Sequence, residues 1–135
     1  MGPIELVEAT EPSEWLTPEL KELADDASKT DNTHIYRVID DGREVAFVSL
    51  DIWPGESFTI LYKMYVSSTL RGQGIGTRTV ASVEAFTTCL GRSSVRLVAH
   101  PLDNTISEDQ LIHWYGRLGY AKDPKSEQGE LVKNL

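Results

Sequence analysis

One stretch of the sequence limits the fold more than any other: a β-rich run that leads through alternating glycines into a helical pattern. Residues 57 to 66 are rich in β-branched and aromatic side chains, which is typical of a strand. Glycines follow at 72, 74 and 76, and apolar residues then recur at helical spacing over 75 to 90. A glycine-rich turn that opens a helix builds an anion site, because the first-turn amides point away from the helix. The sequence therefore predicts a strand–loop–helix unit that binds phosphate.

Two common phosphate-binding loops do not fit this run, whose sequence is Arg71-Gly72-Gln73-Gly74-Ile75-Gly76. A P-loop requires Lys and then Ser or Thr after its last glycine, whereas Thr77 and Arg78 follow here. A dinucleotide fingerprint requires the spacing G-x-G-x-x-G, which would need glycine instead of Thr77. A glycine-rich turn without a ligand remains the alternative, so the run favours anion binding without identifying the anion.

The flanking patterns predict one α+β domain over residues 1–135. We expect an antiparallel meander, then a helix that crosses over to a parallel strand, then a helix and a final hairpin, with helices on both faces of the sheet. Asp41-Gly42 and Pro54-Gly55 mark hairpin turns, Gly91 ends a helix, and Ser107 to Gln110 forms a capping box. The predicted strands are 4–9, 35–39, 44–53, 57–66, 95–99, 120–122 and 130–132. The predicted helices are 15–27, 75–90 and 107–118, and a cap followed by proline at Thr17-Pro18 leaves open that the first of these is two short helices.

Composition excludes several classes of function. The formal net charge of −8 argues against nucleic-acid binding, which needs a basic face. The sequence has no apolar run that could span a bilayer and no secretion signal, so we expect a cytoplasmic protein without a membrane partner. Cys89 is the only cysteine, which leaves no disulfide and no cysteine metal site, and we expect no metal. Its place in a helical pattern predicts a packed side chain.

Two motifs give the chain a resemblance to a known family. Residues 71–76 match the pattern Arg/Gln-x-x-Gly-x-Gly/Ala that lies between the fourth strand and the following helix of the GNAT superfamily of N-acetyltransferases. The segment Trp114-Tyr115-Gly116-Arg117-Leu118-Gly119-Tyr120 is similar to a second feature of that family. The resemblance extends over residues 57 to 120. It departs from the family at Glu108, where an asparagine is frequent.

The resemblance implies that acetyl-CoA is the co-substrate and that an acetyl group moves to a primary amine in a direct ternary complex. It also implies that the backbone of the fourth strand holds the pantetheine and the thioester carbonyl, while the glycine loop holds the pyrophosphate. The residues expected to bind acetyl-CoA are Met64, Tyr65, Val66, Arg71, Gly72, Gln73, Gly74, Ile75, Gly76, Thr77 and Arg78.

The catalytic groups are expected at the acceptor end of this site. Tyr115 is the candidate general acid for the leaving thiolate, and packing is the alternative interpretation of its position in a helix. Asp51 and Glu56 are the candidate bases, with His100 and His113 after them, unless a chain of waters removes the proton. Trp53 and Glu22 are candidate acceptor contacts.

Seven carboxylates occur between residues 11 and 31 in the first quarter of the chain, against Lys21 and Lys29. In the family this segment borders the acceptor, so the resemblance implies a cationic amine. Two other functions remain open: a regulator that binds coenzyme A without catalysis, and an acidic interaction or inhibitor protein. A homodimer is compatible with the sequence. The acidic residues are Glu11, Glu14, Glu19, Glu22, Asp25, Asp26 and Asp31.

Overall fold

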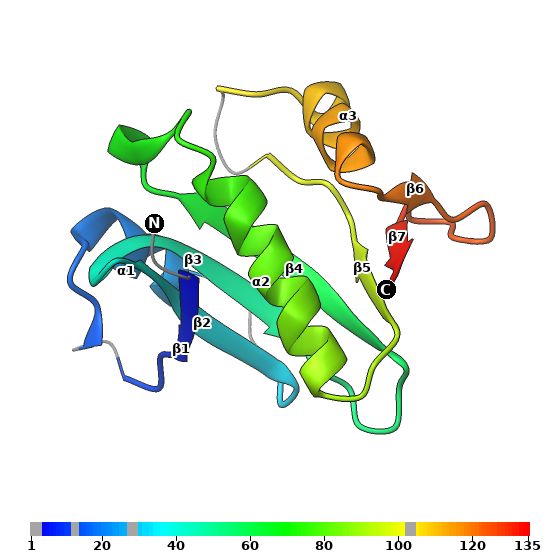
Figure 1. The fold of residues 1–135 in the computed structure, drawn as a ribbon, viewed down its shortest axis with the longest axis horizontal. Helices are drawn as coiled ribbons and strands as arrows, with labels where there is room; N and C mark the ends of the chain where they lie inside the picture. Colours follow the sequence, from blue (N-terminus) through cyan, green and yellow to red (C-terminus); the bar gives the residue numbers. More distant parts are fainter. Residues whose placement is uncertain (1–3, 12–13, 27–29, 102–104) are drawn as a thin grey trace.

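A computed structural model describes residues 4–11, 14–26, 30–101 and 105–135. In these ranges the chain forms one seven-stranded mixed sheet, which is the α+β architecture that the sequence predicts (Figure 1). The strands lie in the order β1 (Ile4–Glu8), β2 (Thr33–Asp40), β3 (Arg43–Asp51), β4 (Phe58–Val66), β5 (Ser94–Leu97), β7 (Leu131–Asn134) and β6 (Ala121–Lys122).

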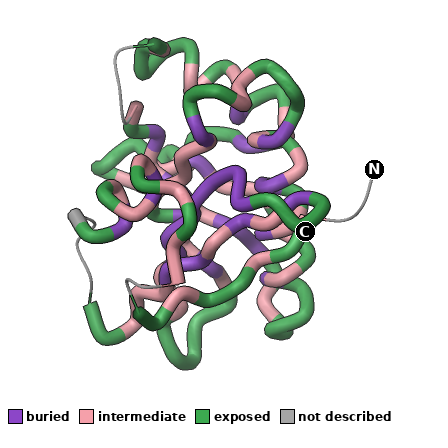
Figure 2. Tube along the Cα trace, turned by 90° about the vertical axis from the view of Figure 1, so that its left-hand side faces the viewer, coloured by how far each residue is buried: buried purple, intermediate pink, exposed green. Residues whose placement is uncertain are grey.

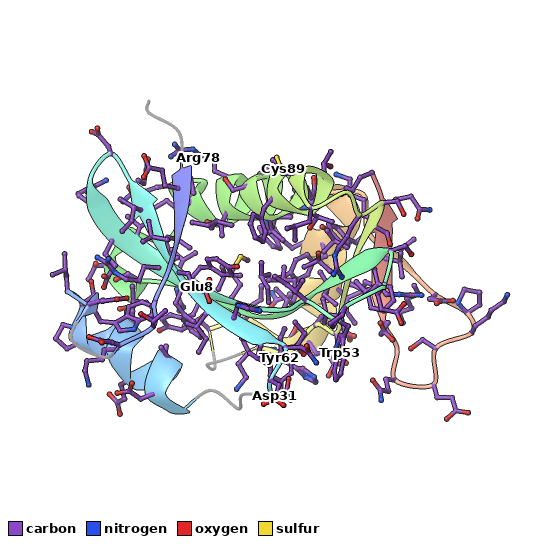
Figure 3. The ribbon with its side chains drawn as sticks, turned by 90° about the horizontal axis from the view of Figure 1, so that it is seen from below. Glu8, Asp31, Trp53, Tyr62, Arg78 and Cys89 are labelled. Atoms are coloured by element: carbon purple, nitrogen blue, oxygen red, sulfur yellow. The ribbon has the colours of Figure 1, made fainter. Side chains whose placement is uncertain are left out.

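The helices cover both faces of this sheet. Helix α2 (Ile75–Cys89) lies across one face and α1 (Pro18–Asp26) against the other, as Figure 3 shows edge-on. Helix α3 (Glu108–Arg117) packs against the same core cluster as α2. A short 3₁₀ helix, η2 (Ser68–Leu70), joins the end of β4 to the glycine loop. The predicted placement of helices on both faces is therefore confirmed.

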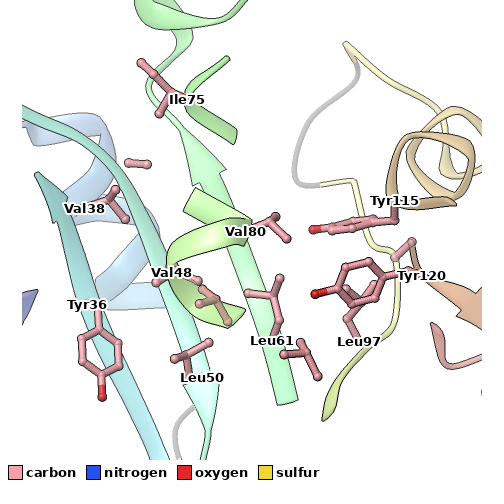
Figure 4. Packing of buried hydrophobic residues seen from close by; sticks show 14 of the residues in the cluster. Tyr36, Val38, Val48, Leu50, Leu61, Ile75, Val80, Leu97, Tyr115 and Tyr120 are labelled. Atoms are coloured by element: carbon pink, nitrogen blue, oxygen red, sulfur yellow. The ribbon is translucent and has the colours of Figure 1, made fainter. Parts of the chain in front are cut away.

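The larger core lies between the sheet and the helices α2 and α3. It combines aliphatic side chains of β2 to β5 with Val80 and Val83 of α2 and Tyr115 of α3 (Figure 4). A smaller cluster of Ala24, Ile35 and Phe47 packs beneath α1. Figure 2 shows the buried segments gathered in the middle of the trace, with exposed turns around them. Burial of this apolar surface is the main force that holds the helices on the sheet.

A buried carboxylate anchors the segment that leads into α1. Glu44 accepts hydrogen bonds from the amides of Leu16 and Thr17, at 3.1 and 2.8 Å, and from Arg37 Nε at 2.7 Å. Burial opposes ionisation of Glu44, but these donors hold its pKa below the usual value. The acidic charge therefore fixes the N-terminal segment to β2 and β3.

Local sequence signals set several element boundaries as predicted. Asp41 and Gly42 have φ of 51° and 77° in the β2–β3 turn. Gly91 has φ of 77° and ends α2 in a Schellman motif, where the amides of Gly91 and Arg92 donate to Thr88 and Thr87. Strands β6 and β7 pair as the expected antiparallel hairpin. The capping box of α3 is also present, with hydrogen bonds in both directions between Ser107 and Gln110.

Several expectations were wrong. Helix α1 begins at Pro18 and not at residue 15, and β3 ends at Asp51 and not at residue 53. Cys89 is exposed, and its side chain lies on the side of α2 that faces away from the sheet (Figure 3). Helical spacing suggested a packed side chain, but Cys89 lies on the outer face of α2, whereas Thr87 on the inner face of the same turn is fully buried. Strand β5 ends at Leu97, before the predicted end at Ala99.

The end of β5 creates the main irregularity of the sheet. Strands β4 and β5 pair in parallel only from Phe58–Ser94 to Leu61–Leu97, and β4 then continues to Val66 along β3. Figure 1 shows β4 and β5 diverging towards the glycine loop and α3. Among the described residues, the edge of β4 that faces β5 thus has no strand partner from Tyr62 to Val66. Its backbone groups must find other partners if they are buried.

Candidate functional site

A cavity of about 530 Å³ lies where β4 and β5 separate. Its walls come from the unpaired end of β4, the glycine loop, the first turn of α2, the segment after β5, and α3. Most of the residues expected to bind the coenzyme line it. They are Met64 to Val66, Arg71, Gly72 and Gly74 to Thr77, together with the candidate acid Tyr115.

The glycine loop presents backbone at one end of this cavity. Gly72 and Gly74 have φ of 80° and 76°, a region that favours glycine over residues with a side chain. Gly74 is the N-cap of α2, so the free amides of the first turn open beside it. A Cβ on Gly76 would lie 3.4 Å from Trp114 Cζ2 and 3.8 Å from Val66 Cγ2. A side chain at position 76 would thus come into van der Waals contact with Trp114 and Val66, which shows that α2 lies close to α3 and β4 here.

Arg71 joins the walls of the cavity. Its guanidinium lies 4.7 Å from the centre of the Tyr65 ring, and its Nη1 donates to Thr105 Oγ1 at 2.8 Å. Its Nε lies 3.4 Å from the carbonyl oxygen of Val66. The side chain thus connects the end of β4 to the segment before α3. A phosphate at the loop would meet this charge in a fixed position.

Helix α1 also touches the approach to the glycine loop. Glu19 accepts hydrogen bonds from the amide and hydroxyl of Ser68, at 3.0 and 2.8 Å. The Ser68 amide is the main cause that lowers the pKa of Glu19, and Arg71 adds a smaller electrostatic effect. One of the acidic residues of the N-terminal quarter is therefore engaged in holding η2.

Tyr115 differs from the neighbouring Tyr120 in its hydrogen bonding. Their ring centres lie 5.7 Å apart (Figure 4), and burial raises the pKa of both phenols. The hydroxyl of Tyr120 donates to Glu84 at 2.9 Å, and Lys133 donates to the same carboxylate at 3.1 Å. The Tyr115 hydroxyl makes no hydrogen bond with any described residue, although Tyr115 lines the cavity. Tyr115 thus remains a protonated phenol beside the cavity.

The other predicted site residues do not line the cavity. Arg78 forms a two-point ion pair with Asp40, at 2.8 and 3.0 Å, on the β1 side of α2 (Figure 3). The carboxylate of Asp51 accepts a hydrogen bond from Thr33 at 2.5 Å. The remaining four are exposed: Glu22 on α1, Trp53 and Glu56 in the turn between β3 and β4, and Gln73 in the loop. The structure therefore gathers most of the residues predicted to bind the coenzyme at one cavity, and it leaves the first-choice bases Asp51 and Glu56 outside that cavity.

Three further lining residues carry chemistry: Lys63 and Trp114 had no predicted role in the site, and His100 was a second-choice base. Lys63 lies on β4, and His100 follows the end of β5. Trp114 contacts the Tyr115 ring, with centroids 4.8 Å apart. The signal for His100 was its position just after a strand that pairs in parallel with β4, because such strand ends meet at one edge of a sheet. Lys63 could be found only by knowing which face of β4 it occupies.

Two negative findings apply to the described ranges 4–11, 14–26, 30–101 and 105–135. No group of three or more His, Cys, Asp or Glu side chains there has the arrangement of a metal site. No helix there is long and apolar enough to cross a bilayer.

Comparison with known proteins agrees with this geometry. The sequence model of the acetyltransferase (GNAT) family matches residues 3–120. No curated protein sequence gives a significant match. A GNAT family acetyltransferase from Elizabethkingia anophelis, solved with acetyl-CoA bound, superposes with a TM-score of 0.66 at 17% identity, covering 100% of both chains.

Two further solved structures share the fold. The PaiA N-acetyltransferase from Thermoplasma acidophilum, in complex with coenzyme A, gives a TM-score of 0.59 at 15% identity over 77% of this chain. This chain spans 62% of that protein's length. The KacTA–DNA complex contains a chain with a TM-score of 0.68 at 14% identity, covering 97% of this chain and 92% of that one. At these identities the likeness shows the fold alone.

Proposed function

This chain belongs to the acetyltransferase (GNAT) family, and from that premise we propose that it moves an acetyl group from acetyl-CoA to a primary amine in a direct ternary complex. One observation carries the proposal: the cavity where β4 and β5 separate runs from the glycine loop to Tyr115 and His100. The same space can hold a phosphate at one end and a reacting acyl group at the other.

The residues of this cavity fit the chemistry of acetyl-CoA. The α2 amides and Arg71 would bind the pyrophosphate, because both supply fixed positive potential. Between Tyr62 and Val66, those amides of β4 that point to the open edge would donate to the pantetheine and to the thioester carbonyl. Apolar Leu111 and Trp114 offer a surface for the pantetheine chain.

Two side chains are suited to proton transfer during the reaction. Tyr115 would protonate the leaving thiolate, since its buried phenol keeps its proton and has no competing hydrogen-bond partner among the described residues. His100 lines the cavity, and imidazole is the side chain that most often serves as a general base. It replaces Asp51 and Glu56 as the preferred candidate. Exposed Cys89 lies outside the cavity lining, which favours direct transfer over an acetyl-cysteine intermediate.

The proposal has two rivals. A coenzyme-A-binding regulator would bind acetyl-CoA through the same cavity without turnover. An interaction protein would not need the cavity at all. The KacTA–DNA complex contains a chain of this fold together with DNA, so a macromolecular partner stays an alternative. A cytoplasmic location, the lack of a metal, a homodimer and the lack of nucleic-acid binding stay predictions.

The test is a titration with acetyl-CoA followed by an assay of free thiol over a set of amines. A ligand at one hundred times its dissociation constant stabilises the native state by about 2.7 kcal/mol, which a thermal shift detects. Stabilisation together with thiol release that depends on the amine is the expected result. Stabilisation without release would favour the regulator, and no stabilisation would leave only the interaction protein.

A further inference from the structure

The side chains that line the cavity have an unexpected charge. The chain as a whole carries a formal net charge of −8. Yet, within the described part of the chain, the lining contains Lys63, Arg71 and His100 and no Asp or Glu. The charge of Arg71 already has a proposed role, because Arg71 lies beside the glycine loop where the pyrophosphate would bind. Lys63 has no such role, and its charge therefore bears on what else enters the cavity.

Lys63 lies at the opposite end of the cavity from the glycine loop. The last residue pair between β4 and β5 is Leu61–Leu97, so Lys63 comes two residues after the strands separate. Arg71 follows only after the rest of β4 and all of η2. The thioester would lie along the unpaired edge of β4, and Lys63 therefore borders the acyl end of the proposed site.

A β-bulge determines the direction of the Lys63 side chain. Leu61 pairs with Leu50 and Lys63 pairs with Ser49, so Tyr62 is an extra residue on β4. Ser49 in turn pairs with Ile35, which packs beneath α1. Directly paired residues share a face, so Lys63 projects to the α1 side of the sheet, away from α2.

Tyr62 accompanies Lys63 on this side. Its exposed ring is visible on the face of the sheet opposite α2 (Figure 3), and Lys63 Nζ lies 5.6 Å from its centre. Lys63 forms no ion pair with the described residues. Asp51 ends β3 on the same face, but it bonds to Thr33 and does not line the cavity. The ammonium of Lys63 is therefore a half-buried cation without a carboxylate partner.

We propose that the acceptor is a small amine that also carries a carboxylate, and that Lys63 binds this carboxylate from the α1 side of the cavity. The inference rests on the proposed acetyl transfer and names its substrate class. In that reaction the amine nitrogen bonds to the acetyl carbon as the carbon–sulfur bond breaks. The amine loses a proton, and the coenzyme leaves as a thiol. The carboxylate takes no part in these steps and serves only to hold the amine in place.

This substrate class differs from the cationic acceptor that the acidic segment suggested. A second ammonium near Lys63 would be repelled, and no lining carboxylate in the described ranges would compensate. A carboxylate would instead form a charge-assisted hydrogen bond with Lys63. The acidic residues with assigned contacts are engaged elsewhere, as Glu19 is with Ser68 and Asp25 with Lys21.

The experiment uses three amines of equal length that differ in one end group: 4-aminobutyrate, butylamine and 1,4-diaminobutane. Glycine and β-alanine, with their own neutral and diamine counterparts, extend the set to shorter chains. Thiol release is measured with each amine at saturating acetyl-CoA. The acids should be the best acceptors. Their kcat/KM should be about tenfold or more above that of the amines with an uncharged end group, as expected for a hydrogen bond between charged groups. The diamines should be the poorest.

Two variants assign the preference to Lys63. Lys63→Met keeps the length of the side chain and should remove the advantage of the acids mainly through KM. Lys63→Glu should invert the order, so that the diamines become the best acceptors. Lys125→Glu makes the same charge change at an exposed position between β6 and β7 and should leave the order unchanged. Thermal shift with acetyl-CoA checks that each variant is folded and binds the coenzyme.

The outcomes separate this inference from the proposed function. Turnover of butylamine or the diamines in preference to the acids would overturn the inference and leave acetyl transfer intact. An acid preference that survives in Lys63→Met would also overturn it, because another residue would then bind the carboxylate. Stabilisation by acetyl-CoA without release from any amine would reject both. An acid preference that the charge reversal inverts would support both.

Discussion

The two ends of the cavity are built in different ways. At the coenzyme end, the amides at the N-terminus of α2 and the positive-φ glycines Gly72 and Gly74 form the wall, and Arg71 is the main charged side chain. At the proposed acceptor end, side chains form the wall, among them Lys63, His100 and Tyr115. A wall made of backbone depends on the fold and on glycine, whereas a wall made of side chains can change by single substitutions. If the proposed function holds, we therefore expect substitutions to change the acceptor more readily than the coenzyme.

A charge placed at the coenzyme end should have the largest effect. Gly74→Glu introduces a carboxylate at the N-cap of α2, where nothing lies within 4 Å of a Cβ and where a phosphate would bind. Repulsion and obstruction should weaken acetyl-CoA binding by about a hundredfold or more, measured by calorimetry. Gly129→Glu is the matched control, because Gly129 has φ of 75° and open space around it but lies outside the cavity lining. Equal binding by both variants would contradict the assignment of the loop.

The two tyrosines of the core give the next largest effect. Tyr115→Phe should lower kcat by about a hundredfold, as is usual for a general acid, and should leave the melting temperature nearly unchanged. The reason is that the Tyr115 hydroxyl has no hydrogen bond to lose among the described residues. Tyr120→Phe should do the reverse: it loses the bond to Glu84 and about 1 kcal/mol of stability, with little change in kcat. If Tyr115→Phe retains full kcat, Tyr115 serves in packing only.

A third prediction concerns the segment before α1 and depends on pH. Glu44→Gln should lower the free energy of unfolding by about 2 kcal/mol at neutral pH, because it weakens the bonds to Arg37 and to the amides of Leu16 and Thr17. The pKa of Glu44 is lowered in the native state, so the carboxylate stabilises the fold above its unfolded-state value of 4.5. This contribution is lost as the pH falls through the lower native-state pKa. Urea unfolding should therefore show the difference between the two proteins shrinking in acid, and a constant difference would contradict the assignment.

The smallest effect is expected on the exposed face of α1. Glu22→Gln and Asp25→Asn should each change kcat/KM for the best acceptor by less than about twofold, because neither residue lines the cavity. Steady-state kinetics at low ionic strength give the most sensitive measurement, since salt screens exposed charges. A loss of tenfold would restore the acidic segment as an acceptor site and would weaken the case for Lys63.

The sequence was most informative where backbone conformation alone decides the structure. Gly91, the Asp41-Gly42 turn and the capping box of Ser107 each contain a residue type that is strongly preferred in the backbone conformation found there. All three predictions were confirmed. The glycine loop belongs to the same class, and most of its residues line one cavity, while their binding of the coenzyme stays a prediction. Gln73 and Arg78 do not line that cavity, and Arg78 pairs with Asp40 instead. This was missed because a periodic sequence pattern does not show which neighbour a long side chain will contact.

The acceptor end was harder to predict because it depends on register. Lys63 reaches the α1 side through the extra residue at Tyr62, and a bulge of this kind leaves no certain mark in the sequence. Asp51 and Glu56 were chosen for lying near strand ends, but Asp51 bonds to Thr33 and Glu56 lies in an exposed turn. His100 reaches the cavity because β5 ends at Leu97, earlier than its apolar residues suggested.

Because β5 ends early, its length determines how much of the edge of β4 stays open. Four residue pairs join β5 to β4, and the length of β4 left over sets how much of a coenzyme's arm can lie against bare backbone. Extending the pairing by two residues would seal that edge with ladder hydrogen bonds and close the pocket without altering Arg71, Tyr115 or the glycines. We therefore expect the proposed activity to depend partly on where the pairing between β4 and β5 ends. An alignment that compared only the identities of the lining residues would overlook it.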